Sequence, residues 1–138
     1  MSASSIGCDK RDGVIRVVPE TNEIVAVSIE GEVDLADVRI LGDEIDRALA
    51  SGNGLIFDLS EATFIDSSVL HVLVRAARTA SARAQPVVLQ LGTTAIVERA
   101  VGIARIEQVL PRAHDRQEAV QIVRQQARTL SSQVRDGC

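Results

Sequence analysis

The spacing of hydrophobic residues changes along this chain, and the changes mark alternating strands and helices. Residues 14–18 and 24–29 are rich in β-branched side chains, and Pro19-Glu20-Thr21-Asn22 between them has the composition of a turn. This pattern predicts a β-hairpin near the start of the chain.

The next segment changes to helical spacing. Apolar residues recur every three or four positions, and charged residues fill the positions between them. These apolar residues are Val38, Leu41, Ile45, Ala48 and Leu49. Asp34 is a candidate N-cap for this helix, because a short acidic side chain accepts hydrogen bonds from the free N–H groups of a first turn. Ser51-Gly52-Asn53-Gly54 is expected to end it.

Residues 55–59 and 87–91 are apolar runs without alternation, as expected of strands covered on both faces. Residues 67–83 between them have helical periodicity. A strand, a helix and a strand in this order predict a parallel crossover. Beyond it we expect a short helix over residues 93–101, an edge strand over 107–110 and a closing helix over 115–130.

This order of elements predicts an α/β fold with a mixed sheet, in which an antiparallel hairpin leads into parallel βαβ crossovers with about four helices. A chain of 138 residues has room for one domain, which we place at residues 13–130. Residues 1–12 and 131–138 are polar and aperiodic, and we expect them to be flexible tails.

Composition excludes some partners. The chain has two phenylalanines, no Trp and no Tyr, so its core is expected to be aliphatic and it lacks aromatic platforms for stacking bases. Its net charge of -4 is unfavourable for binding phosphate backbones. Nucleic acid is therefore not an expected partner.

The sequence has neither a long apolar run nor a secretion signal, so we expect no membrane span and a cytoplasmic location. Cys8 and Cys138 lie in the expected tails, and two distant thiols make neither a disulfide framework nor a zinc site. We expect no metal and no cofactor. The oligomeric state stays open.

The sequence lacks the residues that several enzyme classes require. The only lysine is Lys10, and no Gly-Lys-Ser/Thr tripeptide is present, which excludes a P-loop. Asp58 lacks the lysine and the acidic pair that accompany a phosphoaccepting aspartate in receiver domains, and we expect it to cap a turn. Ser67 and His71 are spaced as a nucleophile and a base on one helix face, so a small hydrolytic or nucleotide-binding enzyme stays an alternative.

Residues 58–70 depart most from an ordinary connection. They join a buried strand to a helix and end in Asp66-Ser67-Ser68, directly before the helical periodicity. By itself this arrangement predicts only an N-cap. The motif Asp58-Leu59-Ser60-x-x-x-Phe64-Ile65-Asp66-Ser67-Ser68-x-Leu70, with Gly31-x-Val33-Asp34 before it, resembles the STAS domain of bacterial anti-sigma factor antagonists. The resemblance covers residues 14–130.

This resemblance implies a function. In that family the first serine after the aspartate accepts a phosphate from a partner that is both a serine kinase and an anti-sigma factor. The corresponding residue is Ser67, with Ser68 as the local rival. The unmodified protein would bind the ATP-binding, kinase-like anti-sigma factor and free the sigma factor, and a serine phosphatase would restore Ser67. The implied partner-binding residues are Asp34, Asp66, Ser67, Ser68 and Val69, with the exposed side of the helix over residues 67–83.

A serine at a helix start suits such a switch. A phosphate there adds about -1.5 to -2 charges near the positive end of the helix dipole, so the surface changes while the fold survives.

One position departs from the family pattern, because Val69 stands where glycine is usual. Its branched side chain is expected to obstruct a kinase cleft. The alternative function is therefore a constitutive STAS scaffold, an accessory subunit of a signalling or transport complex without a phosphate cycle.

Overall fold

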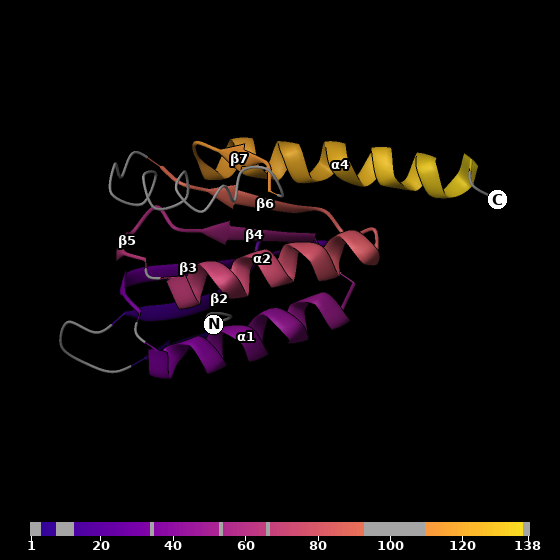
Figure 1. The fold of residues 1–138 in the computed structure, drawn as a ribbon. Helices are drawn as coiled ribbons and strands as arrows, with labels where there is room; N and C mark the ends of the chain where they lie inside the picture. The colour runs from indigo at the N-terminus through magenta and orange to yellow at the C-terminus, as the bar shows by residue number, and fades with distance from the viewer. Residues whose placement is uncertain are drawn as a thin grey trace.

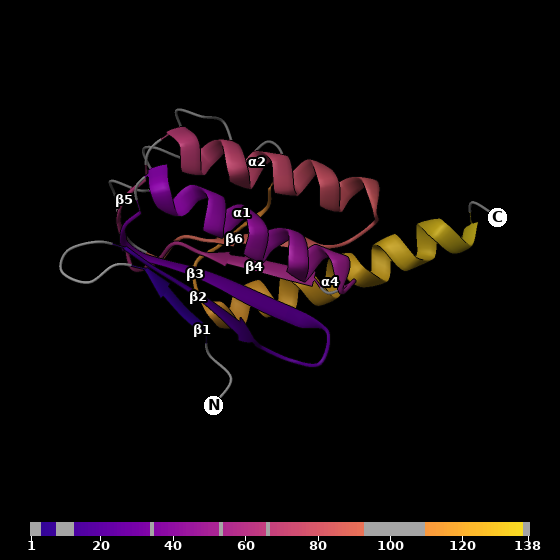
Figure 2. The same cartoon turned by 90° about the horizontal axis from the view of Figure 1, so that it is seen from below.

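The chain folds around one mixed β-sheet with helices on both faces. The computed structural model describes residues 4–7, 13–33, 35–52, 54–65, 67–92 and 110–136. Its elements are β1 (Ser4–Gly7), β2 (Val14–Pro19), β3 (Ile24–Glu32), α1 (Leu35–Ala50), β4 (Gly54–Asp58), β5 (Ala62–Phe64), α2 (Ser67–Ala82), β6 (Val87–Gln90), β7 (Arg112–Ala113) and α4 (Arg116–Asp136). Helices α1 and α2 lie on one side of the sheet and α4 on the other (Figures 1 and 2).

The sheet confirms the predicted α/β class. Its strand order is β1-β2-β3-β4-β6-β7, and β5 pairs separately with β3. The first three strands are antiparallel, whereas β3, β4, β6 and β7 run parallel to one another. The hairpin followed by parallel crossovers is therefore present as expected.

The number and placement of the later elements differ from expectation. The described residues contain three helices instead of about four. The helix expected over residues 93–101, and most of the strand expected over residues 107–110, lie outside the described residues. The edge strand that pairs with β6 is Arg112–Ala113. Leu110 is 1% exposed but not in a strand, so its apolar character reflects burial in the core.

Part of each predicted tail forms regular structure among the described residues. Residues 4–7 form β1, which pairs with β2 antiparallel. An edge strand gains backbone hydrogen bonds whatever its side-chain pattern, so polar residues gave no signal for it. Helix α4 continues to Asp136 instead of ending near residue 130, because each added residue of a formed helix contributes another backbone hydrogen bond.

Two apolar layers hold the helices to the sheet. Between the sheet and α1 and α2 lies the larger core, which includes Phe57, Leu41 and Leu73. Ile56 and Val88 face the opposite way and pack in the smaller cluster that includes Val123 of α4. All of β4 is buried, as its run of apolar residues without alternation predicted.

A polar cluster ties α4 to the end of β4. Asp58 Oδ1 accepts hydrogen bonds from the N–H (2.9 Å) and the hydroxyl (2.6 Å) of Ser60, which confirms its predicted place in a turn. Its Oδ2 accepts a hydrogen bond from Arg116, the first residue of α4. Arg116 also donates to Gln90 Oε1 at 2.7 Å and to Glu20 Oε1 at 2.7 Å.

Arg116 remains charged in this cluster. Burial lowers the pKa of its guanidinium, but the hydrogen bonds and charges of Asp58 and Glu20 outweigh burial and raise the pKa above its ordinary value. The side chain of Asp58 is 11% exposed. Arg116 therefore supplies the cation that this mostly buried carboxylate needs.

We predict that Arg116→Met destabilises the fold by about 2 kcal/mol, because it leaves Asp58 mostly buried without a cation. Urea denaturation followed by circular dichroism measures this loss as a lower midpoint. Arg128→Met is the matched control, since Arg128 is an exposed arginine of the same helix. Equal midpoints for the two variants would contradict the structural role of Arg116.

Candidate functional site

The pairing of β5 with the end of β3 builds the candidate site. Gly31 pairs with Ala62 and Glu32 with Phe64, and the Gly31 N–H donates to the Glu61 carbonyl at 3.0 Å. The two strands are parallel, so they end at the same edge of the sheet, beside the first turns of α1 and α2 (Figures 1 and 2).

Two of the predicted partner-binding residues follow these paired strands directly. Asp34 is two residues after β3 and Asp66 is two residues after β5. Both lie outside the described residues, so their side chains stay a sequence prediction. What the structure places side by side is the pair of strands that leads to them.

Strand β5 lies within residues 60–66, where the sequence predicts only a connection between a strand and a helix. The run Thr63-Phe64-Ile65 consists of residues that favour strands and could have indicated one. Three residues were too few to separate from a loop by sequence alone.

The segment before β5 is held close to the sheet. The Leu59 N–H donates to the Gln90 carbonyl at 2.8 Å, and the Gly92 N–H donates to the His114 carbonyl at 3.1 Å. Gly92 has a φ of 67°, and a Cβ there would lie 2.9 Å from the Cβ of Ser60. A glycine is therefore required where the chain after β6 passes Ser60.

Helix α2 begins at Ser67, as predicted. Ser67 is exposed and Ser68 is half-buried. The hydroxyl-bearing side chain of Ser67 therefore lies on the surface at the end of α2 that carries the positive partial charge of the helix dipole. Of the two rival serines, Ser67 is the more accessible one.

Val69 does not lie on the surface, which corrects two expectations. Its side chain is 0% exposed and packs in the core beneath α1 and α2. It points inward because it lies on the side of α2 opposite Ser67. The Val69 side chain therefore neither contacts a partner nor obstructs a kinase cleft.

Phe64 belongs to the motif around Ser67, and its exposure makes it a candidate binding residue. It is 45% exposed, and no other large hydrophobic side chain of the described residues is classed as exposed. Phe57, the other aromatic residue, is 0% exposed. Exposed Thr63 and Glu32 lie on the same paired strands. We call Glu32, Phe64 and Ser67 the docking edge.

The alternative of an enzyme built on Ser67 and His71 gains no support. His71 is exposed one turn after Ser67, and within the described part of the chain no hydrogen bond or ion pair orients its imidazole. A catalytic base of this kind needs a third group to hold it.

The described residues contain no cluster of three or more His, Cys, Asp or Glu side chains that could hold a metal ion. None of the helices in the part of the chain described is both long and apolar enough to cross a membrane.

Comparison with protein families identifies the class of this domain. The family model described as "Mlab, STAS domain" matches residues 17–112. The chain therefore belongs to the STAS domain family, as the motif around Ser67 predicted. No curated protein matches the sequence.

Solved structures share the fold at low identity. An anti-sigma factor antagonist from Mycobacterium paratuberculosis is 21% identical, with a TM-score of 0.65, covering 89% of this chain and 95% of its own. SpoIIAA in its unphosphorylated form is 21% identical, with a TM-score of 0.69 and coverages of 80% and 96%. The phosphorylated form of SpoIIAA, a Bacillus cell fate determinant, is 20% identical, with a TM-score of 0.63 and coverages of 78% and 96%.

We predict that Val69→Ala lowers the free energy of unfolding by about 2 kcal/mol and Val69→Gly by about 3 kcal/mol. The first change removes buried methyl groups, and the second adds the cost of glycine within a helix. Urea denaturation measures both losses. Ser81→Ala, at an exposed position of the same helix, is the control. A Val69→Gly variant as stable as the wild type would show that this side chain is not part of the core.

Proposed function

We propose that this STAS domain is an anti-sigma factor antagonist. With Ser67 unmodified it binds an anti-sigma factor of the serine-kinase type and so frees the sigma factor. Phosphorylation of Ser67 by that partner ends binding. A serine phosphatase then removes the phosphate and restores binding. In this role the protein is a cytoplasmic binding module of transcription regulation and not an enzyme.

The observation that carries this proposal is the exposed Ser67 side chain at the first residue of α2. A kinase can reach a hydroxyl there without opening the core, because the buried residues of α2 lie on its other side. The positive end of the helix dipole stabilises a negative charge at this position. The fold is therefore expected to survive modification.

The relatives give further support. Structures of SpoIIAA described as unphosphorylated and as phosphorylated both share this fold. This supports a STAS domain that carries or lacks a phosphate without changing its architecture. The buried position of Val69 removes the steric objection that its difference from glycine had raised.

The size of the expected effect is sufficient for a switch. A phosphate adds about -1.5 to -2 charges at pH 7. Like charges placed together at an interface cost several kcal/mol, and each 1.4 kcal/mol weakens binding about tenfold. One phosphate at the docking edge is therefore enough to release a partner.

A second candidate is a constitutive scaffold or accessory subunit of a signalling or transport complex. The observation that favours it is the matching family model, which is described by the name Mlab and not by anti-sigma activity. A scaffold of this kind needs the docking edge but no phosphate cycle. The state of Ser67 would then not affect its complex.

We predict that a purified anti-sigma factor with a kinase-like ATP-binding domain, encoded in the same genome, transfers one phosphate to Ser67. Mass spectrometry after incubation with ATP should locate it there in the wild type and in Ser68→Ala, and find none in Ser67→Ala. Titration calorimetry should show Ser67→Glu binding about tenfold more weakly or worse, because the added charge lies at the interface.

The melting temperatures of the Ser67 variants should stay near that of the wild type, because Ser67 is exposed. If the partner transfers no phosphate and binds Ser67→Glu as tightly as the wild type, the scaffold is supported and the switch is overturned. A phosphate found on Ser68 alone would move the site.

We predict that Phe64→Ala weakens the same complex about tenfold while changing stability little, because an exposed aromatic side chain at a docking edge is a typical binding anchor. Calorimetry measures affinity and urea denaturation measures stability. Thr63→Ala, at the neighbouring exposed position of β5, should bind as the wild type does. A Phe64→Ala complex of unchanged affinity would place the interface elsewhere.

A further inference from the structure

The exposed face of α2 carries basic residues that begin one turn after Ser67. His71, Arg75 and Arg78 follow Ser67 at spacings of three or four residues, which place them on one face of the helix, and all are exposed. Helix α2 contains no Asp or Glu. We call His71, Arg75 and Arg78 the α2 basic stripe.

The two arginines of this stripe are not neutralised by the described residues around them. Among those residues, Arg16, Arg47 and Arg116 form ion pairs within 4.0 Å, whereas Arg75 and Arg78 form none. Both guanidinium groups are therefore available to carboxylates from outside the molecule.

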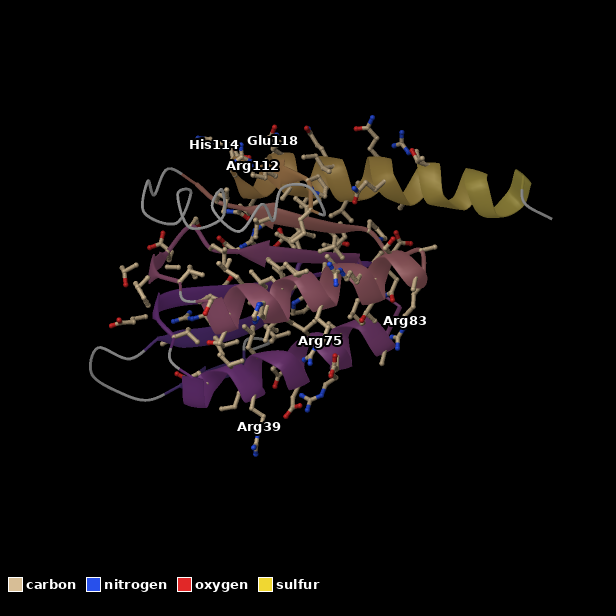
Figure 3. All side chains as sticks on the ribbon, in the orientation of Figure 1. Arg39, Arg75, Arg83, Arg112, His114 and Glu118 are labelled. Atoms are coloured by element: carbon tan, nitrogen blue, oxygen red, sulfur yellow. The ribbon has the colours of Figure 1, made fainter. Side chains whose placement is uncertain are left out.

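The position of Arg75 extends the stripe toward α1. Its guanidinium lies over Gly42 of α1, 3.5 Å from where a Cβ would be, on the side of α2 that faces α1 (Figure 3). Asp46 lines the same small groove between the helices but does not reach ion-pair distance from Arg75 within the described structure.

We infer that the α2 basic stripe binds an acidic surface of a partner protein, and that a phosphate on Ser67 acts by competing with and repelling that surface. Arginine is enriched in protein interfaces and binds carboxylates through two hydrogen bonds. The inference rests on the proposed function for the existence of a phosphate-controlled partner. It adds the charge of the partner's surface, which the proposed function does not specify.

The direction of the switch supports an acidic partner. A phosphate on Ser67 would strengthen binding to a basic surface and weaken binding to an acidic one, and only the second outcome turns an antagonist off. Along the axis of α2, His71 lies about 6 Å and Arg75 about 12 Å from Ser67. The Debye length is about 8 Å at physiological salt, so the phosphate acts mainly on this end of the stripe.

A phosphate on Ser67 would also lie on the same face of the helix as the stripe, four residues before His71. Its negative charge competes with external carboxylates for the stripe. Repulsion and competition therefore act in the same direction.

A hexaglutamate peptide is the probe for this surface. Added to the isotope-labelled protein at low ionic strength, it should shift the amide resonances of residues 71–78 most, whereas hexalysine should leave them in place. The double variant Arg75→Glu with Arg78→Glu should lose these shifts, and Ser67→Glu should weaken them. Shifts spread evenly over all exposed arginines, or absent from α2, would overturn the inference.

The matched control is Arg39→Glu with Arg112→Glu, which changes the net charge equally. Both arginines are exposed; Arg112 lies on β7, and Arg39 lies on α1 with its side chain directed away from α2 (Figure 3). This variant should retain the hexaglutamate shifts on α2. Thermal denaturation checks that both double variants are folded.

The same variants separate this inference from the proposed function once an anti-sigma factor is shown to bind. The α2 double variant should bind it about tenfold more weakly, and the control double variant within about twofold of the wild type. Equal binding of the α2 variant would overturn the inference and leave the proposed function standing. Hexaglutamate shifts on the stripe without any anti-sigma binding would support the inference and count against the proposed function.

Discussion

Strand β3 is long enough to pair with two parallel strands in succession, and the position of the site depends on this. Residues 24–28 of the strand pair with β4 in the main sheet. Gly31 and Glu32, at its end, pair with β5 instead. The chain leaves β4 through the turn that Asp58 and Ser60 stabilise, and then returns to the edge of the same long strand. Both helices on this face consequently start from one edge of the sheet.

The two sides of α2 separate the residues of the core from the residues of the proposed switch. Val69, Leu73 and Ala76 are among the residues that fill the core. Ser67 and the basic stripe lie on the opposite side, where a changed charge meets solvent or a partner and not the core. A switch needs this separation, because a protein is only marginally stable and a modification that reached the core would unfold it.

On the other face of the sheet, Arg116 anchors α4 to the ends of two strands. Arg116 at the start of α4 joins the ends of β4 and β6 through Asp58 and Gln90. The same carboxylate holds Ser60 just before β5. The motif aspartate is therefore a structural residue, engaged through both of its oxygens.

The periodicity of the sequence determined the fold class, the hairpin, the start of α2 and the buried strands, because burial on one or two faces leaves a repeat of its own in the order of residues. The motif around Ser67 determined the family. Only the tertiary structure decided that Val69 faces inward while Phe64 faces outward. Two apolar residues of one segment look alike in sequence, and their burial depends on which packed element lies above each.

Short pairings were likewise decided by the tertiary structure. Strands β1 and β5 exist because β2 and β3 offer them unpaired edges, and such short strands have too few residues to be recognised from their own side chains. The role of Arg116 is of the same kind, since its partners Glu20, Asp58 and Gln90 lie far from it in sequence. Local sequence determines what each segment prefers, and the meeting of distant segments decides what each residue touches.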